Sequence, residues 1–208
     1  MTWYDAPVMK MTAPRYVIRK QKQMAALASA ARQEIVDVLV EAGALSVAEI
    51  GMILGRPADA LYFHLRALKL AGLVLQDGYR YRGRRKEALF RTVSPDLRLQ
   101  YEPRSEANRR AVTAIVSSML RMGIRDFRRG FRQGGVMVAG GHRELWGLRM
   151  VSRLTPPQLA EVNRLIERLR RTTSKPKERG RLYGVTVLLT PIDHRRRGAK
   201  GNRKREQA

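Results

Sequence analysis

The sequence predicts an α+β protein in which helices and a β-hairpin come first, followed by a long helix and a small strand-helix-strand region. Two helical periodicities carry this prediction, because apolar residues recur at steps of three and four between residues 24 and 71 and again between 105 and 133. A third observation is residues 73–93, where short strand-forming runs surround turn residues and a concentration of positive charge. The 44% hydrophobic content is sufficient for a packed core.

Three helices are predicted ahead of the hairpin. The first covers residues 24–42, whose apolar residues share one face and which a glycine follows. The second covers residues 46–54 and opens with a capping box, in which Ser46 caps the helix and Glu49 reaches back to it. The third covers residues 57–71, because proline is favoured at the first helical position and a glycine again follows the last turn.

The hairpin is predicted from alternating residues around a basic cluster. Residues 73–76 form a first strand, Asp77-Gly78 is a tight-turn signal, and the runs 79–82 and 88–93 flank the cluster. Five of seven consecutive residues in the cluster are cations: Arg80, Arg82, Arg84, Arg85 and Lys86. Three helices followed by a hairpin with a basic tip describe a winged helix-turn-helix.

The same residues carry a family resemblance. Residues 26–35, ALASAARQEI, resemble the opening helix of ArsR-type bacterial repressors, and residues 61–74, LYFHLRALKLAGLV, are similar to that family's recognition helix and its exit into the hairpin. The resemblance covers residues 24–93 and implies a homodimeric transcriptional regulator that binds operator DNA through the third helix and the wing. The family's thiolate metal sensing is excluded, because the chain has no cysteine.

The start of the third helix departs from the family pattern. Pro57, Ala58, Asp59 and Tyr62 stand where the family often has serine or threonine. Because base edges meet the N-terminal end of a recognition helix, we expect sequence choice there and phosphate contacts from Arg66 and the wing. Tyr62 could instead pack on the first helix, and the wing arginines could form a solvated turn. The predicted DNA-binding residues are Arg56, Pro57, Ala58, Asp59, Tyr62, His64, Arg66, Arg80, Arg82, Arg84, Arg85 and Lys86.

The second half of the chain is predicted to hold a dimerisation or effector region. A helix over residues 105–133 has an apolar stripe, and strands over 145–154 and 182–190 flank a helix over 155–171. We expect the stripe to join two copies, unless the strand-helix-strand unit covers it within one chain. The stripe consists of Val112, Ile115, Val116, Met119 and Phe127. Arg121, Arg125, Arg128 and Arg132 line another face of this helix, and this face is open to three interpretations: a solvated surface, a DNA-flank contact or a docking surface.

These predictions divide the chain into four parts. They are an N-terminal arm (1–23), a winged helix-turn-helix DNA-binding domain (24–95), a dimerisation or effector region (104–192) and a basic tail (193–208).

Charge and missing motifs limit the function. The formal net charge of +24 and the sequence pI of about 11.5 favour a nucleic-acid partner. The three histidines, His64, His142 and His194, belong to no metal-site or catalytic motif, so we expect no enzyme, metal or cofactor. The longest uncharged run, 182–192, is too short to cross a bilayer, and residues 1–20 contain no signal-peptide core, so a cytoplasmic protein is expected.

The predicted function is a sequence-specific DNA-binding transcriptional regulator, a repressor acting as a homodimer on double-stranded DNA. The first alternative is a sequence-tolerant nucleic-acid-binding or nucleoid-type protein that uses the basic tail and the arginine face. The second is a protein-interaction module whose winged domain contacts a partner. The sequence identifies no effector ligand.

Overall fold

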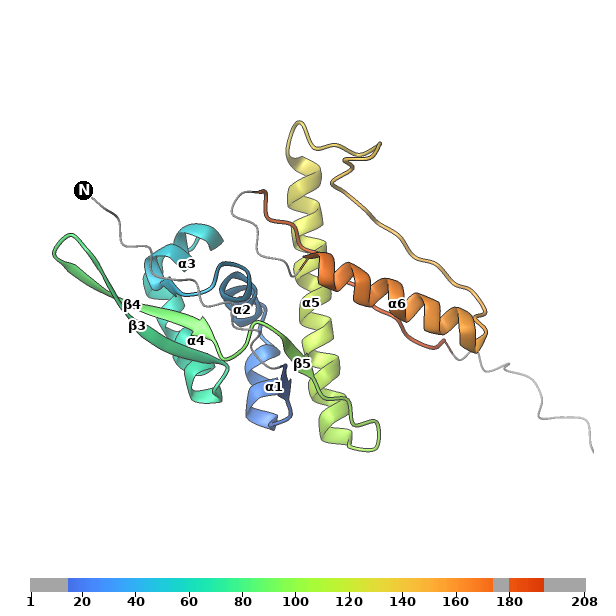
Figure 1. Ribbon diagram of the computed structural model, residues 1–208, viewed down its shortest axis with the longest axis horizontal. Coiled ribbons are helices and arrows are strands. Elements are labelled where there is room, and N and C mark those ends of the chain that lie inside the picture. Colours follow the sequence, from blue (N-terminus) through green and yellow to red (C-terminus); the bar gives the residue numbers. More distant parts are fainter. Residues whose placement is uncertain (1–14, 174–179, 193–208) are drawn as a thin grey trace, which may run out of the picture.

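The computed structural model describes residues 15–173 and 180–192 and has the predicted α+β architecture (Figure 1). A winged helix-turn-helix lies on one side of a long upright helix, α5, and the helix α6 lies on the other side. Among the described residues, no helix is long and apolar enough to span a membrane. The elements in chain order are β1 (Tyr16–Ile18), α1 (Gln21–Leu27), α2 (Ala30–Ala42), β2 (Leu45–Ser46), α3 (Val47–Leu54), α4 (Ala58–Ala71), β3 (Val74–Arg82), β4 (Arg85–Thr92), β5 (Leu97–Leu99), α5 (Glu106–Arg132) and α6 (Pro156–Thr173).

The helix-turn-helix consists of α3 and α4, and local capping fixes both helices. The capping box predicted for α3 is confirmed: the Ser46 backbone N–H donates to Glu49 at 2.8 Å, and the Glu49 N–H donates to the Ser46 hydroxyl at 3.4 Å. Gly55 ends α3 in the left-handed region at φ 63°, which suits a residue without a Cβ. Pro57 is the N-cap of α4, so the helix begins at Ala58, one position after the predicted start.

Gly51 permits the close approach of the turn to α3. A Cβ at this position would lie 2.7 Å from the backbone oxygen of Arg56. Because that neighbour is backbone, we expect Gly51→Ala to destabilise the fold by about 2 kcal/mol, which corresponds to a melting temperature lower by roughly 4–8 °C. Gly134→Ala is the control, since a Cβ there meets no atom within 4 Å. Equal melting temperatures for both variants in calorimetry would contradict this account of the turn.

Two N-terminal features differ from the prediction. The helix predicted over 24–42 is two helices, because Ser29 has an extended backbone (φ −100°, ψ 125°) and is the N-cap of α2. In addition, the folded domain begins before residue 24. β1 pairs in parallel with β5, with Tyr16 opposite Leu97 and Ile18 opposite Leu99, and Ile18 is buried in the core.

The hairpin forms a three-stranded sheet in the order β2-β4-β3. Asp77-Gly78, predicted as a turn, is instead a bulge inside one long strand. Gln76 pairs with Phe90 and Tyr79 with Ala88, so β3 holds one more residue than β4 across this step. Gly78 takes a φ of 81°, which bulges of this kind favour. The turn of the wing lies at the basic cluster, where Gly83 has a φ of 61°.

The N-terminal half of α5 completes the core of the winged domain. Ala111 and Ile115 are buried in the same cluster as Ile35 and Leu39 of α2. Polar contacts reinforce this packing, since the Gln33 side chain of α2 donates to the Ile115 carbonyl at 3.2 Å. The predicted helix over 105–133 is therefore confirmed, and its first half is an intrachain core element.

The C-terminal region is described over residues 134–173 and 180–192. The predicted helix is confirmed as α6, but the strands predicted over 145–154 and 182–190 are wrong, because neither segment has a strand pairing. Alternating apolar residues predict a half-buried strand only where a neighbouring backbone completes the ladder. In Figure 1 the first segment runs beside α6, and the second crosses α5 before it follows α6. Ion pairs from Glu167 to Arg98 (3.2 Å) and from Arg170 to Asp96 (3.6 Å) connect α6 to the winged domain.

Candidate nucleic-acid interface

The helix α4 presents an exposed face near its N-terminal end. Leu61, Leu65 and Leu68 are buried on the opposite side, so they hold the helix against α1, α2 and α3. Asp59 and Arg66 are exposed, and Ala58 is half-buried. Tyr62 is 55% exposed, so it does not pack on the first helix as the alternative interpretation proposed. The geometry leaves this face free to enter a groove of a nucleic acid.

The sequence prediction missed Phe63, which is 71% exposed on the same face. Phe63 follows Tyr62 directly, and the period of Leu61, Leu65 and Leu68 places both aromatic residues away from the core. A large apolar ring held in water at the reading end of a helix is a candidate for contact with a thymine methyl group. The helical period was therefore sufficient to identify it.

His64 lies toward the protein rather than on the exposed face. It is half-buried, and its ring meets that of Phe63 edge to face at 5.6 Å between centroids. Desolvation, together with the positive charges of Arg32 and Arg56, lowers the pKa of His64 below the ordinary histidine value. The side chain is therefore uncharged at neutral pH, which makes it a poor phosphate ligand.

Arg56, directly before the N-cap of α4, is held by an acidic partner. Its guanidinium lies 2.5 Å from a carboxylate oxygen of Glu34, which is buried on α2. The other oxygen of Glu34 accepts from Arg125 of α5. One carboxylate thus connects the start of α4 to the middle of α5.

The wing separates its five cations into two groups. Arg80 lies 2.5 Å from Glu49 of α3, and Lys86 lies over the ring of Tyr79 at 4.0 Å from its centroid. Although desolvation opposes it, hydrogen bonds from Ser46 and Arg80 lower the pKa of Glu49, so this ion pair stays charged at neutral pH. Arg82, Arg84 and Arg85 are exposed and have no ion pair with the described acidic residues. The wing tip therefore holds three arginines ready for an anion.

The residues predicted for dimerisation are distributed over two environments. Ile115 is buried in the core of the winged domain, and Met119 is half-buried against that core. Val112 is also buried and Val116 is half-buried, but neither belongs to that core cluster. Phe127 is exposed, and its ring stacks on that of Phe131 at 6.1 Å between centroids. The first half of α5 contacts α1 and α2, so helices of the winged domain, which the intrachain alternative did not include, cover part of the stripe.

The fold and the exposed face of α4 define a winged helix-turn-helix protein. Residues 27–77, from the end of α1 through α4 into β3, match the family described as a helix-turn-helix domain. No curated protein matches the chain. A helix-turn-helix domain over these residues indicates a DNA-binding regulator.

Proposed function

We propose that this protein is a sequence-specific transcriptional repressor that binds double-stranded DNA as a homodimer. The observation that carries the proposal is the exposed N-terminal face of α4 beside a wing with three unpaired arginines, within the helix-turn-helix match. In this function Asp59, Tyr62 and Phe63 read base edges, whereas Arg66, Arg82, Arg84 and Arg85 contact phosphates. The ArsR resemblance of residues 24–93 supports the same assignment.

Selection of bound duplexes from random-sequence DNA tests this function directly. A regulator enriches one motif and prefers it over random duplex by about a thousandfold or more. A pseudo-palindrome with half-sites about one helical turn apart is expected for a two-fold dimer. Uniform recovery of all sequences would instead support a sequence-tolerant nucleic-acid binder. Repression is then tested with the selected motif placed inside a reporter promoter.

Asp59 provides a test of base reading. A carboxylate near DNA phosphates is repelled, but it can accept a hydrogen bond from cytosine N4. We expect Asp59→Ala to relax the preference at one base position by about 1–3 kcal/mol, measured by competition between single-base variants of the selected motif. Asp59 also lies in the first turn of α4, where an acidic residue favours the helix dipole. If Asp59→Ala instead increases the affinity for every sequence by the same factor, Asp59 only stabilises the helix and does not read a base.

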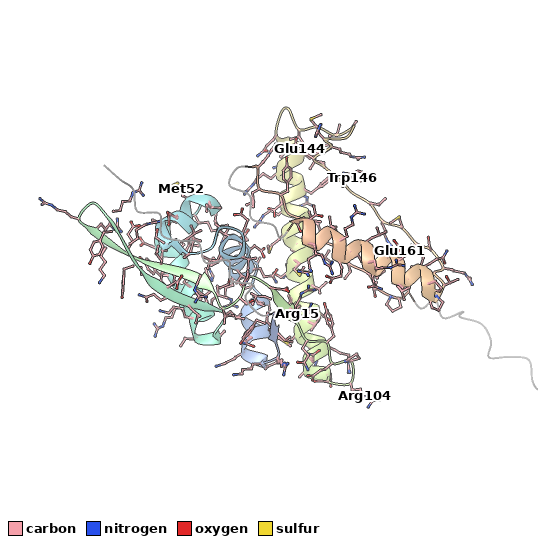
Figure 2. All side chains as sticks on the ribbon, viewed as in Figure 1. Arg15, Met52, Arg104, Glu144, Trp146 and Glu161 are labelled. Atoms are coloured by element: carbon pink, nitrogen blue, oxygen red, sulfur yellow. The ribbon has the colours of Figure 1, made fainter. Side chains whose placement is uncertain are left out.

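The homodimer is proposed from the apolar surface that the C-terminal half leaves in water. Twenty-one large apolar side chains of the described residues between 120 and 192 are 40–76% exposed. At about 50 Å² each they present on the order of 1,000 Å², and a stable interface needs about 800 Å² from each partner. Single chains rarely expose a connected apolar patch beyond a few hundred Å². Trp146, labelled in Figure 2, belongs to this surface.

A second copy of the chain is the partner that best fits the exposed apolar surface of the C-terminal half. The exposed apolar face of α5 consists of Leu120, Ile124, Phe127 and Phe131, which recur at helical steps and so form one flat stripe. An isologous contact pairs that stripe with itself around a two-fold axis. The extended segments beside α6 also retain backbone groups that can pair with the same segments of a second copy. The dimer contact therefore lies in the second half of α5 and beyond, not at Val112 and Ile115.

A further inference from the structure

Five arginines line one groove on the C-terminal half of α5. The groove has a volume of about 770 Å³ and opens to solvent along the helix. Helical periodicity places these arginines on a face next to the apolar stripe proposed for the dimer, and Ile124 of that stripe lies at the edge of the groove. The groove is lined by Arg121, Ile124, Arg125, Arg128, Arg129, Arg132 and Gln133.

Four of these arginines lack an acidic partner among the described residues. Arg125 forms ion pairs with Glu34 and Asp126, whereas Arg121, Arg128, Arg129 and Arg132 form none with the described carboxylates. All four are exposed, so no burial explains their position. Like charges at helical spacings of three and four repel each other. An anion along this face would relieve that repulsion.

The length of the array favours an extended polyanion over a compact ligand. Residues 121 and 132 are 11 positions apart, so the guanidinium groups are spread over about 16 Å along the helix axis. A compact anion would reach one or two of them. Duplex DNA carries one phosphate per about 3.4 Å of each strand, and so presents several charges over this distance.

The position of the groove connects it to the DNA-reading helix. Glu34 binds Arg125 from the groove and Arg56 from the start of α4, so the two elements meet at one carboxylate. In Figure 1 the wing tip and α5 lie on opposite sides of the helices α2, α3 and α4. A duplex that lies across α4 would therefore have the wing at one flank of α4 and the arginine groove of α5 at the opposite flank.

We infer that the α5 arginine groove binds DNA backbone phosphates on the side of α4 opposite the wing. This inference rests on the proposed DNA binding, but it adds a contact surface outside the helix-turn-helix and its wing. Arg121, Arg128, Arg129 and Arg132 supply the charge. Arg125 is a positioning residue, because Glu34 holds it and aligns the groove with the start of α4.

Salt-dependent binding of the full-length protein to a mixed-sequence duplex of several helical turns tests the inference. The test variant replaces Arg121, Arg128, Arg129 and Arg132 by glutamine. The matched control replaces Arg104, Arg109, Arg168 and Arg171 by glutamine, which removes the same charge from other exposed surfaces. We expect the test variant to lower the slope of log K against log salt by about 2–4 and the affinity at least tenfold, because each lost phosphate contact changes the slope by about 0.9. The control should change the slope by less than about 1.

The outcomes separate this inference from the proposed function. If the wild-type protein binds the duplex and both variants have the same slope, the groove does not contact DNA and the inference is overturned alone. If the wild-type protein binds no duplex, the proposed function fails with it. Calorimetric titration with inorganic pyrophosphate gives a further check: saturable binding that only the test variant loses, with an unchanged DNA slope, would identify a small-anion site and overturn the inference.

Discussion

Replacing Arg82, Arg84 and Arg85 by alanine is expected to weaken binding to all duplexes by a similar factor, roughly a hundredfold at moderate salt. Each exposed phosphate contact contributes about 1 kcal/mol, and tenfold in affinity corresponds to about 1.4 kcal/mol. The slope of log K against log salt should flatten by up to about 2.7, because three phosphate contacts are lost. Fluorescence anisotropy over a salt series measures both quantities. The expectation follows from the absence of acidic partners for these arginines among the described residues.

A matched triple variant on α6 separates a local contact from the effect of net charge. Arg164, Arg168 and Arg171 are exposed residues of α6, and this helix lies on the far side of α5 from the wing (Figure 1). Changing them to alanine removes the same charge. If the wing variant and the α6 variant shift the slope equally, the wing is a solvated turn and only total charge matters. Motif preference should survive in the wing variant, because phosphate contacts carry no direct sequence information.

Changing Ile115 to glutamate is expected to unfold the protein rather than only separate its subunits. Ile115 is 3% exposed and belongs to the core shared by α1, α2 and α5. A carboxylate in this position loses its hydration without gaining a partner, and the expected cost of about 4 kcal/mol or more is a large share of a typical total stability. Loss of the cooperative melting transition in circular dichroism is the measurement.

Phe127→Glu on the same helix is the comparison for Ile115→Glu. Phe127 is 40% exposed in one chain and lies on the stripe proposed to pair with a second copy. This variant should keep its far-ultraviolet spectrum but lose dimer mass in light scattering and weaken operator binding. A folded Ile115→Glu variant would show that the winged domain does not depend on α5. A wild-type mass of one protomer, at concentrations where the selected motif is bound, would rule out the dimer.

The winged helix-turn-helix was predictable because its signals are local. The Ser46 capping box, the period of Leu61, Leu65 and Leu68, and the glycines that end the helices all operate within a few residues. The pairing of β1 with β5 was not predictable, because two three-residue strands about 80 positions apart have no periodicity of their own. The prediction of two C-terminal strands was wrong for the opposite reason. Their alternation of apolar residues is clear, but a β-strand also needs a neighbouring backbone with which to form hydrogen bonds.

For the candidate interface, the sequence predicted which residues are exposed better than it predicted which residues they contact. The sequence placed Asp59, Tyr62 and the wing arginines on exposed elements, and the structure exposes them. It did not reveal that Arg80 pairs with Glu49 or that Arg56 pairs with Glu34, because those carboxylates come from other helices. Such contacts depend on how the helices pack, which one-dimensional periodicity does not specify.

The burial of Ile115 and Ile18 has a consequence for how this protein can be divided. A fragment cut at residues 24 and 95 would include the helix-turn-helix match but lose β1 and α5, and with them both of these core side chains. The winged domain and the proposed dimer contact therefore share the helix α5 instead of being joined by a linker. A chimera that replaces the winged domain has to replace α5 with it. Any tilt of α5 would also move α2, because Gln33 and Glu34 of α2 bind Ile115 and Arg125 of α5.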